Sequence, residues 1–113
     1  MNETEGKALQ WLKEHGASEE SIQFQRHASP DFLTNIGKFE VKKAQSKFVI
    51  FTKNQIKLLE TNETTFLVYV TGQEEPLCLN AQELQQKFKL AILNNDEEIQ
   101  VKIDVELIDK LRK

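Results

Sequence analysis

The sequence predicts an α/β protein with a mixed sheet, folded as one domain of 113 residues. Three stretches carry this prediction: apolar residues at helical spacing over 3–15, a strand pair over 29–43, and a continuous apolar run over 65–71. An apolar share of 39% and a charged share of 29% are typical of a globular protein. A chain of this length buries one hydrophobic core but not two, so we expect a single domain over 1–113.

Residues 3–15 predict an amphipathic helix at the start of the chain. Glu3 and Glu5 stand in its first turn, where a negative charge interacts favourably with the helix dipole. Glu5, Leu9 and Leu12 are spaced i, i+4 and i+7, which places Glu5 on or beside the inward face. The apolar positions of this helix are Ala8, Leu9, Trp11 and Leu12.

A first strand is predicted over Ile22–Arg26, where apolar and polar residues alternate, and a hairpin of two strands over Ser29–Lys43. Glu40 and Lys42 are two residues apart on the second strand of this hairpin, so their side chains share a face of the sheet. Val41, between them, points to the other face.

The position of Asp31 depends on the turn of the hairpin. A two-residue loop at Ile36-Gly37 would place Asp31 opposite Lys42, and a loop at Asn35-Ile36 would place it opposite Glu40. Either loop puts the three charged side chains on one face, whereas a slip of one residue would turn Asp31 away.

The rest of the chain predicts shorter elements. Phe48–Phe51 is apolar enough for a strand tail or an ordered loop, and Thr52 is suited to cap a helix over Lys53–Glu60. The apolar run Thr65–Thr71 predicts a strand buried on both faces and central in the sheet. The remaining expected elements are a turn over 72–76, a strand over 77–79, a helix over 81–88, an acidic loop over 94–98, a strand over 99–103, and a terminal helix capped by Asp104 that carries Val105, Ile108 and Leu111.

Cysteine and histidine content excludes several kinds of site. A single cysteine, Cys78, rules out an internal disulfide framework and a zinc site of paired cysteines. Neither His15 nor His27 has a spacing to Cys78 that predicts a nucleophilic Cys/His pair. No apolar run approaches the roughly 20 residues of a membrane span, and the first residues lack the pattern of a signal peptide, so we expect no membrane partner and a cytoplasmic location.

Charge is unevenly distributed along the chain. The net charge of −3 argues against a generally basic nucleic-acid binder, but residues 23–73 hold seven basic and four acidic residues. A local basic excess attracts phosphate, and a solvated lysine-rich face explains it equally well. The basic residues of this segment are Arg26, Lys38, Lys42, Lys43, Lys47, Lys53 and Lys57. The predicted nucleic-acid contacts among them are Lys38, Lys43, Lys47 and Lys53.

The hairpin carries residue types that suit a hard cation. Mg²⁺ binds oxygen ligands, usually one or two carboxylates together with waters and substrate phosphate. Asp31 and Glu40 would supply the carboxylates, the backbone carbonyl of Val41 would add a third protein oxygen, and Lys42 would orient a water or stabilise negative charge. The alternative is that these are solvated polar positions of a half-buried hairpin.

The motif itself favours the metal site. Pro30-Asp31, eight further residues, and then Glu40-Val41-Lys42 resemble the PD-(D/E)XK nuclease superfamily in every lettered position. The resemblance implies a restriction-endonuclease-like core of helix, three strands, helix and strand over about 3–71. Residues from about 72 to 113 have no counterpart in it, and their pattern predicts a small strand-and-helix extension.

Two further stretches extend this resemblance. Many members of the superfamily carry a glutamate in the first helix, and Glu5 fits that position better than Glu3. The segments 39–42, 51–55 and 65–70 together resemble the domain of Mrr-like and NO VEIN-type proteins, where Gln55 would match a polar position of the helix after the catalytic strand.

The resemblance implies a nuclease that acts on DNA with Mg²⁺ or Mn²⁺. Asp31, Glu40 and the Val41 carbonyl would bind the metal, and Lys42 would be the catalytic lysine. Glu5 would be a ligand directly or through water, and Gln55 would orient substrate or a metal-bound water. A homodimer would engage a duplex with two sites, which suits branched DNA such as a Holliday junction. The alternatives are a non-catalytic nucleic-acid-binding or assembly module on the same fold and a nuclease that acts on RNA.

Overall fold

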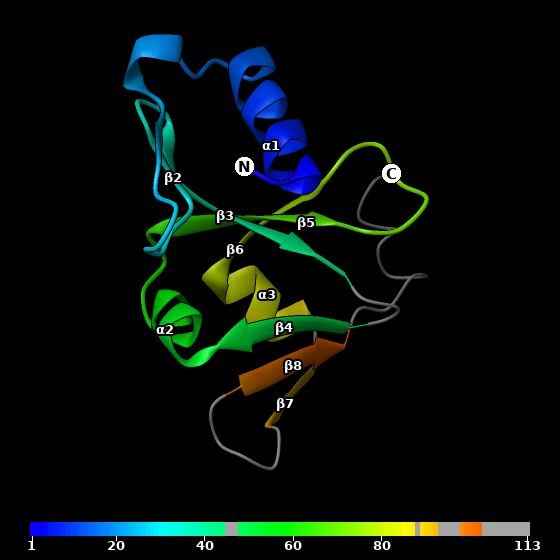
Figure 1. Cartoon of the computed structure of the whole chain (residues 1–113). Coiled ribbons are helices and arrows are strands. Elements are labelled where there is room, and N and C mark those ends of the chain that lie inside the picture. The colour runs from blue at the N-terminus through cyan, green and yellow to red at the C-terminus, as the bar shows by residue number, and fades with distance from the viewer. Residues whose placement is uncertain (45–47, 88, 93–97, 103–113) are drawn as a thin grey trace.

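The computed structural model describes residues 1–44, 48–87, 89–92 and 98–102 (Figure 1). Lys47, most of the predicted acidic loop and the predicted terminal helix after Asp104 lie outside the described residues. The described elements are α1 (Glu3–Glu14), a 3₁₀ turn η1 (Glu19–Ser21), β1 (Gln23–Phe24), β2 (Phe32–Thr34), β3 (Gly37–Lys43), β4 (Phe48–Thr52), α2 (Lys53–Ile56), a 3₁₀ turn η2 (Lys57–Leu59), β5 (Thr64–Tyr69), β6 (Leu77–Asn80), α3 (Ala81–Lys87), β7 (Lys89–Ile92) and β8 (Glu98–Lys102).

The described strands form two sheets. The larger has the order β1-β2-β3-β5-β6, and the smaller has the order β4-β8-β7. In the larger sheet β3 and β5 are parallel, whereas β1–β2, β2–β3 and β5–β6 are antiparallel. The predicted α/β class with a mixed sheet is therefore confirmed. None of the helices in the described ranges has both the length and the apolar character needed to cross a bilayer.

Apolar side chains cover both faces of the larger sheet. On one face, α1 packs Ala8 and Leu12 against Phe32, Phe39 and other buried side chains of the sheet. Figure 1 shows α1 on that side, with α3 and the smaller sheet on the other. The core on that other face includes Val49, Phe51, Leu59, Phe66, Val68, Leu79 and Leu84.

Strand β5 lies between β3 and β6 and belongs to both cores, as predicted for the run over 65–71. Phe66 and Val68 contact one core, and Leu67 and Tyr69 contact the other, because successive strand residues point to opposite faces. Since both faces are buried, the strand consists almost entirely of apolar residues.

Phe66→Ala is expected to lower the free energy of unfolding by about 3–5 kcal/mol, because Phe66 is fully buried and its removal leaves a cavity. Urea denaturation would measure the change. Ile36→Ala is the matched control, since Ile36 is 41% exposed and its truncation creates no cavity. Equal losses in the two variants would contradict the described core.

The largest difference from the predicted order concerns residues 48–51. They form neither a strand tail nor a loop but the strand β4, which pairs with β8 in the smaller sheet. Val49 and Phe51 are fully buried in the core under the larger sheet. This strand interrupts the predicted order of helix, three strands, helix and strand, because it stands between β3 and α2.

Three other segments differ from the predicted elements. The predicted helix over 53–60 is one short helix, α2, continued by the 3₁₀ turn η2, although Ile56 and Leu59 do contact the core as expected. The first strand is limited to Gln23–Phe24. Residues 89–92, for which no element was predicted, form β7 and pair with β8.

Candidate metal-dependent active site

The hairpin of β2 and β3 fixes the position of Asp31. Its register pairs Thr34 with Gly37, so the loop is Asn35-Ile36, one of the two even-length loops predicted. Thr34 Oγ1 donates a hydrogen bond to the Gly37 carbonyl at 2.9 Å, and Gly37 has a φ of 135°, which glycine adopts readily. Asp31 immediately precedes β2, and continuing this register by one residue places it opposite Glu40.

Two hydrogen bonds hold the Asp31 and Glu40 carboxyl groups together. The backbone N–H of Asp31 donates to Glu40 Oε1 at 3.0 Å, and the backbone N–H of Val41 donates to Asp31 Oδ2 at 2.8 Å. The N–H and C=O of one strand residue point to the same edge, so the Val41 carbonyl also points toward the edge that carries Asp31. The two predicted carboxylates and this carbonyl are thus brought to one edge of β3.

Glu40 is fully buried, and only one of its two carboxyl oxygens is hydrogen-bonded within the described part of the chain. Its side chain is 0% exposed, and Oε2 has no hydrogen-bond partner among the described residues. The nearest cation is Lys42, whose Nζ lies 3.8 Å from Oε2. Burial, and then the charge of Asp31, raise the pKa of Glu40 to about 8, although Lys42 acts in the opposite direction. Without a metal, this carboxyl group therefore holds its proton at neutral pH.

Asp31 is perturbed in the same direction. Burial raises its pKa above the usual value, and the hydrogen bond from the Val41 N–H opposes that change. The charge of Glu5 also raises the pKa of Asp31.

Lys42 is held by the segment that follows it in the chain. Its Nζ donates to the Ile50 carbonyl at 3.0 Å and to Gln55 Oε1, and it lies 4.7 Å from the centre of the Phe51 ring. Lys42 is 8% exposed, and burial lowers its pKa, against the opposing effect of Glu40 and Asp31. Strand β4 and helix α2 thus fix the ammonium group beside the two acids.

One side-chain oxygen of Gln55 accepts hydrogen bonds from both the start of α2 and Lys42. Its Oε1 accepts from the backbone N–H of Thr52 at 3.1 Å, which caps α2, and from Lys42 Nζ. The predicted Gln55 therefore contacts Lys42 directly.

The charge of Glu5 acts on Asp31, but the Glu5 carboxylate does not join the pair of carboxyl groups formed by Asp31 and Glu40. Its Oε1 accepts from the backbone N–H of Asn2 at 2.8 Å, and its own N–H donates to Asn2 Oδ1, a capping box at the start of α1. Among the described residues no three His, Cys, Asp or Glu side chains are grouped closely enough to hold a metal ion. The carboxylate set that the structure brings together is thus Asp31 and Glu40. Glu3 is exposed and lines a different pocket.

A polar cleft of about 410 Å³ opens beside Asp31 and Gln55. Its lining includes Arg26, His27, Asp31, Thr52, Asn54 and Gln55. Sequence reasoning counted Arg26 only as part of the basic excess and missed His27, Thr52 and Asn54 as lining residues. These residues are close in sequence to Asp31 or Gln55, and this closeness was the signal that could have predicted them as lining residues.

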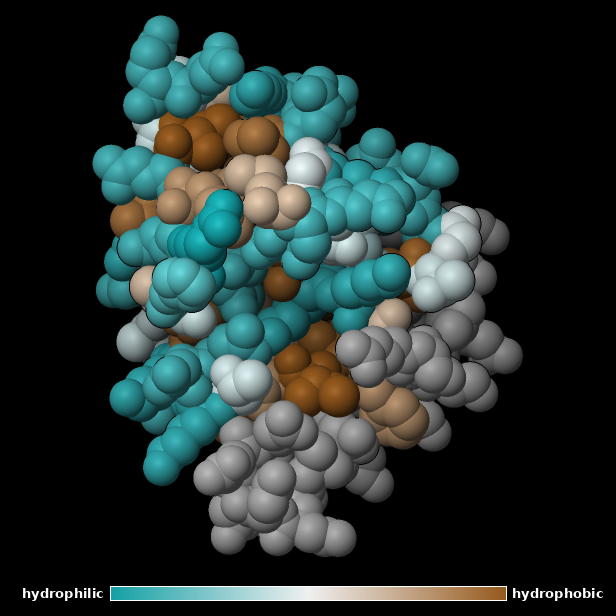
Figure 2. Space-filling model, viewed as in Figure 1, coloured by the Kyte–Doolittle hydropathy of each residue, from teal (hydrophilic) through white to brown (hydrophobic). Residues whose placement is uncertain are grey.

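The three predicted DNA-binding lysines in the described part of the chain have different surroundings. Lys38 pairs with Glu63 at 3.6 Å, Lys53 is exposed in the first turn of α2, and Lys43 lines a pocket beside α1, while Lys47 lies outside the described residues. Figure 2 shows hydrophilic side chains over much of one face, interrupted by an apolar patch over α1 and β2.

The site combines one fully buried acid, one half-buried acid, a buried lysine and a polar cleft, which suits the binding of a cation and of an oxyanion. No protein-family model, curated protein or solved structure matches this chain.

Proposed function

We propose that this protein is a metal-dependent nuclease with a restriction-endonuclease-like core that hydrolyses phosphodiester bonds of DNA. The observation that carries the proposal is Glu40 Oε2, a buried carboxyl oxygen without a hydrogen-bond partner in the described part of the chain, beside Asp31 and 3.8 Å from Lys42 Nζ. Burying an unsatisfied acid costs free energy, so such a group is expected to have a functional partner.

The residues at this edge fit a Mg²⁺ or Mn²⁺ ion. Asp31, Glu40 Oε2 and the Val41 carbonyl supply hard oxygen donors, and one or two carboxylates are the usual protein share for Mg²⁺. A bound ion would neutralise charge on the phosphate and lower the pKa of a water ligand. The charge of Glu5 acts on Asp31, and Glu5 is proposed to interact with the ion through a water.

Hydrolysis also needs groups that stabilise the negative charge of the reacting phosphate, and Lys42 and Arg26 are suited to this role. In this reaction a water oxygen bonds to phosphorus, the bond to the sugar oxygen breaks, and that oxygen gains a proton. Lys42, held by Ile50 and Gln55, presents its ammonium group in a poorly solvated site, where it stabilises negative charge more strongly than in water. Arg26 adds positive charge to the wall of the adjacent cleft.

The substrate is proposed to be branched or duplex DNA, with a homodimer as the acting form. A chain of 113 residues has little surface for reading a base sequence, and two copies related by a twofold axis would present two sites to two strands. The non-catalytic module and the RNA nuclease are the alternatives, and the same assay separates them.

The wild-type protein with Mn²⁺ is expected to cut at least one of branched, duplex and single-stranded DNA, and Asp31→Asn to cut at least about 100-fold more slowly. Asparagine retains an oxygen that accepts the Val41 N–H, so the fold is preserved while the charge is lost. Gel analysis of end-labelled oligonucleotides would measure the rates, with an RNA strand included in the same panel.

Glu20→Gln is the control, because Glu20 is exposed on η1 and lines none of the described pockets near the site. Binding without cutting of any strand would favour the non-catalytic module. Cutting of RNA alone would favour the RNA nuclease, and equal rates for the wild type and Asp31→Asn would refute the assigned site.

A further inference from the structure

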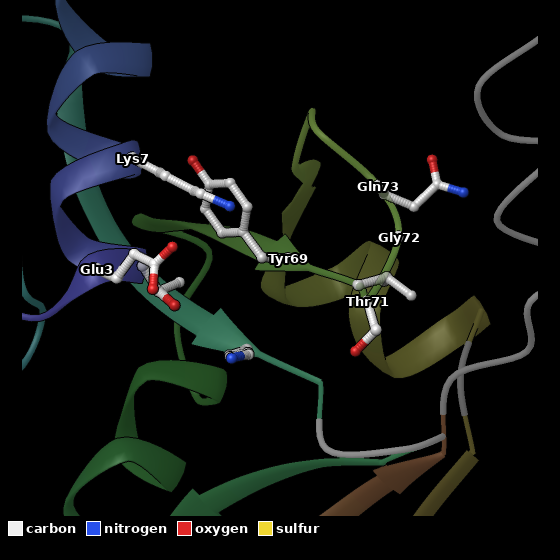
Figure 3. Close-up of a pocket in the computed structure, with 9 residues that line it drawn as sticks. Glu3, Lys7, Tyr69, Thr71, Gly72 and Gln73 are labelled. Carbon is white, nitrogen blue, oxygen red and sulfur yellow. The ribbon is translucent and has the colours of Figure 1, made fainter.

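A second pocket, of about 220 Å³, lies where α1 faces the ends of β3 and β5 (Figure 3). We call it the Lys7–Lys43 pocket. Its lining includes Glu3, Lys7, Lys43, Tyr69, Thr71 and Gln73. Figure 3 shows Glu3 and Lys7 projecting from α1 on one side, and Tyr69, Thr71 and Gln73 coming from β5 and the following loop on the other. This pocket shares no lining residue with the cleft at Asp31.

The lining of this pocket carries more positive than negative charge. Lys7 and Lys43 are exposed, and neither forms an ion pair with a described residue. Glu3 is the one carboxylate among the described lining residues, so two ammonium groups stand against one acid there. Ammonium groups that are not paired within the protein suit an anionic ligand.

Neutral hydrogen-bond donors accompany these lysines. Tyr69 is largely buried, and burial, followed by the charges of Glu75 and Glu14, raises the pKa of its phenol to about 12, so the hydroxyl keeps its proton and can donate. Glu75 and Glu14 do not line the pocket, whereas the Thr71 hydroxyl and the Gln73 amide do. Cations combined with hydroxyl and amide donors are the groups that proteins use to bind the phosphates of DNA.

The Lys7–Lys43 pocket and the candidate metal site share strand β3 but lie on its two faces. Lys43 follows Glu40 by three residues, roughly 10 Å along an extended strand. Because three is an odd number, the Lys43 side chain points to the face covered by α1, whereas the Glu40 side chain points to the other face. The two sites are therefore separate points of contact carried by one strand of the sheet.

We infer that the Lys7–Lys43 pocket binds a backbone phosphate of the DNA, on the face of β3 opposite to Glu40. The identity of the ligand rests on the proposed nuclease function. The pocket adds a second point of attachment for the DNA, separate from the phosphodiester held at Asp31 and Glu40.

Binding measured without metal tests this inference separately from cleavage. Fluorescence anisotropy of a labelled oligonucleotide in EDTA is expected to show binding about threefold to fivefold weaker for Lys7→Gln and for Lys43→Gln. Each change should also reduce the slope of log K against log salt by about 0.7–0.9, because one phosphate contact is lost. Glu3→Gln should tighten binding, since it removes the one acid of the lining.

Lys13→Gln is the matched control, because Lys13 is an exposed lysine of the same helix whose partner is Glu19, away from the pocket. If Lys7→Gln and Lys43→Gln bind DNA like Lys13→Gln, the inference is wrong even if the wild type cleaves DNA. If these two variants bind more weakly although the wild type cuts nothing, the proposed function fails and the pocket stands. Inorganic phosphate that displaces the oligonucleotide at an equal concentration of phosphate groups would overturn the DNA assignment in favour of the free ion.

Discussion

Glu40→Gln is expected to abolish metal-dependent cleavage and, in the absence of metal, to make the protein more stable than the wild type at and above about pH 8. The amide retains an oxygen that accepts the Asp31 N–H, so the hairpin is preserved. It cannot ionise, and it offers a metal one weak oxygen in place of a carboxylate. We expect the cleavage rate to fall by at least about 100-fold.

The stability difference follows from the raised pKa of Glu40. The pKa is about 8 in the folded protein and 4.5 as the ordinary value, so between these limits the folded state binds a proton that the unfolded state lacks. The free energy of unfolding of the metal-free wild type therefore falls as the pH rises from about 5 to 8, by a few kcal/mol. Asp31, whose pKa is also raised, acts with the same sign, and the lowered pKa of Lys42 opposes the fall at higher pH.

Urea denaturation in EDTA at several pH values would measure this effect. The wild type should lose stability with rising pH, Glu40→Gln should lose much less, and the two should converge below pH 4.5, where Glu40 becomes protonated in both states. Glu20→Gln, an exposed change, should follow the wild type. The assignment of Glu40 would be wrong if Glu40→Gln kept the full pH dependence.

Addition of Mn²⁺ extends the same experiment. A cation competes with the proton for the Glu40 carboxylate, so Mn²⁺ should stabilise the wild type more at pH 8 than at pH 6. Glu40→Gln should show little stabilisation at either pH. This readout is independent of cleavage.

The sequence predicted the geometry of the hairpin well because its physical causes are local. A strand period of two put Glu40 and Lys42 on one face, and an even-length loop was the condition for Asp31 to join them. The register confirms the loop at Asn35-Ile36. The sequence did not distinguish between a loop at Asn35-Ile36 and one at Ile36-Gly37, because both place a residue that tolerates a positive φ near the turn.

The environment of Lys42 could not be predicted from nearby residues. Its Nζ contacts the Ile50 carbonyl of β4, and β4 is a strand because it pairs with β8, some fifty residues later in the chain. The apolar pattern of residues 48–51 does not reveal pairing with so distant a strand, because the same pattern fits a strand, a strand tail or a loop. The full burial of Glu40 likewise depends on this second layer, since Phe51 belongs to the core beneath the larger sheet.

Glu5 illustrates a different limit. Helical spacing placed it on or beside the inward face, and its charge does act on Asp31. Spacing gives the direction of a side chain but not its hydrogen-bond partner, and here the Asn2 N–H takes one of its oxygens. A capping box and a metal ligand require the same residue type near a helix start, so the sequence does not separate them.

Lys42→Met is expected to lower the cleavage rate by about 10²–10³-fold while leaving the stabilisation by Mn²⁺ in place. Methionine fills a similar volume in the space beside Phe51 but has no charge and no donor. The metal donors, Asp31 and Glu40, are untouched, so cleavage and metal binding should separate. Glu40→Gln, in contrast, should lose both.

Lys38→Met is the matched control for this change, because Lys38, although predicted from the sequence to contact DNA, pairs with Glu63 in the structure. Lys38 lies on the same strand and the same face, two residues before Glu40, but its side chain is half exposed and pairs with Glu63 at the surface. Loss of such a pair costs at most about 1 kcal/mol, and the residue lines none of the described pockets near the site. Comparable cleavage rates for Lys38→Met and Lys42→Met would remove Lys42 from the reaction.

Lys42→Arg is not expected to restore activity, although it keeps the positive charge. The Lys42 ammonium is enclosed by the Ile50 carbonyl, Gln55 Oε1 and the Phe51 ring, which together fit a compact donor at the end of a narrow chain. A planar guanidinium is larger and carries five donors in a fixed fork, so it would displace Gln55 from the cap of α2 or point away from Glu40. Full activity in Lys42→Arg would show that charge alone is needed, and a low rate would show that the position of the donor, set by β4 and α2, is part of the mechanism.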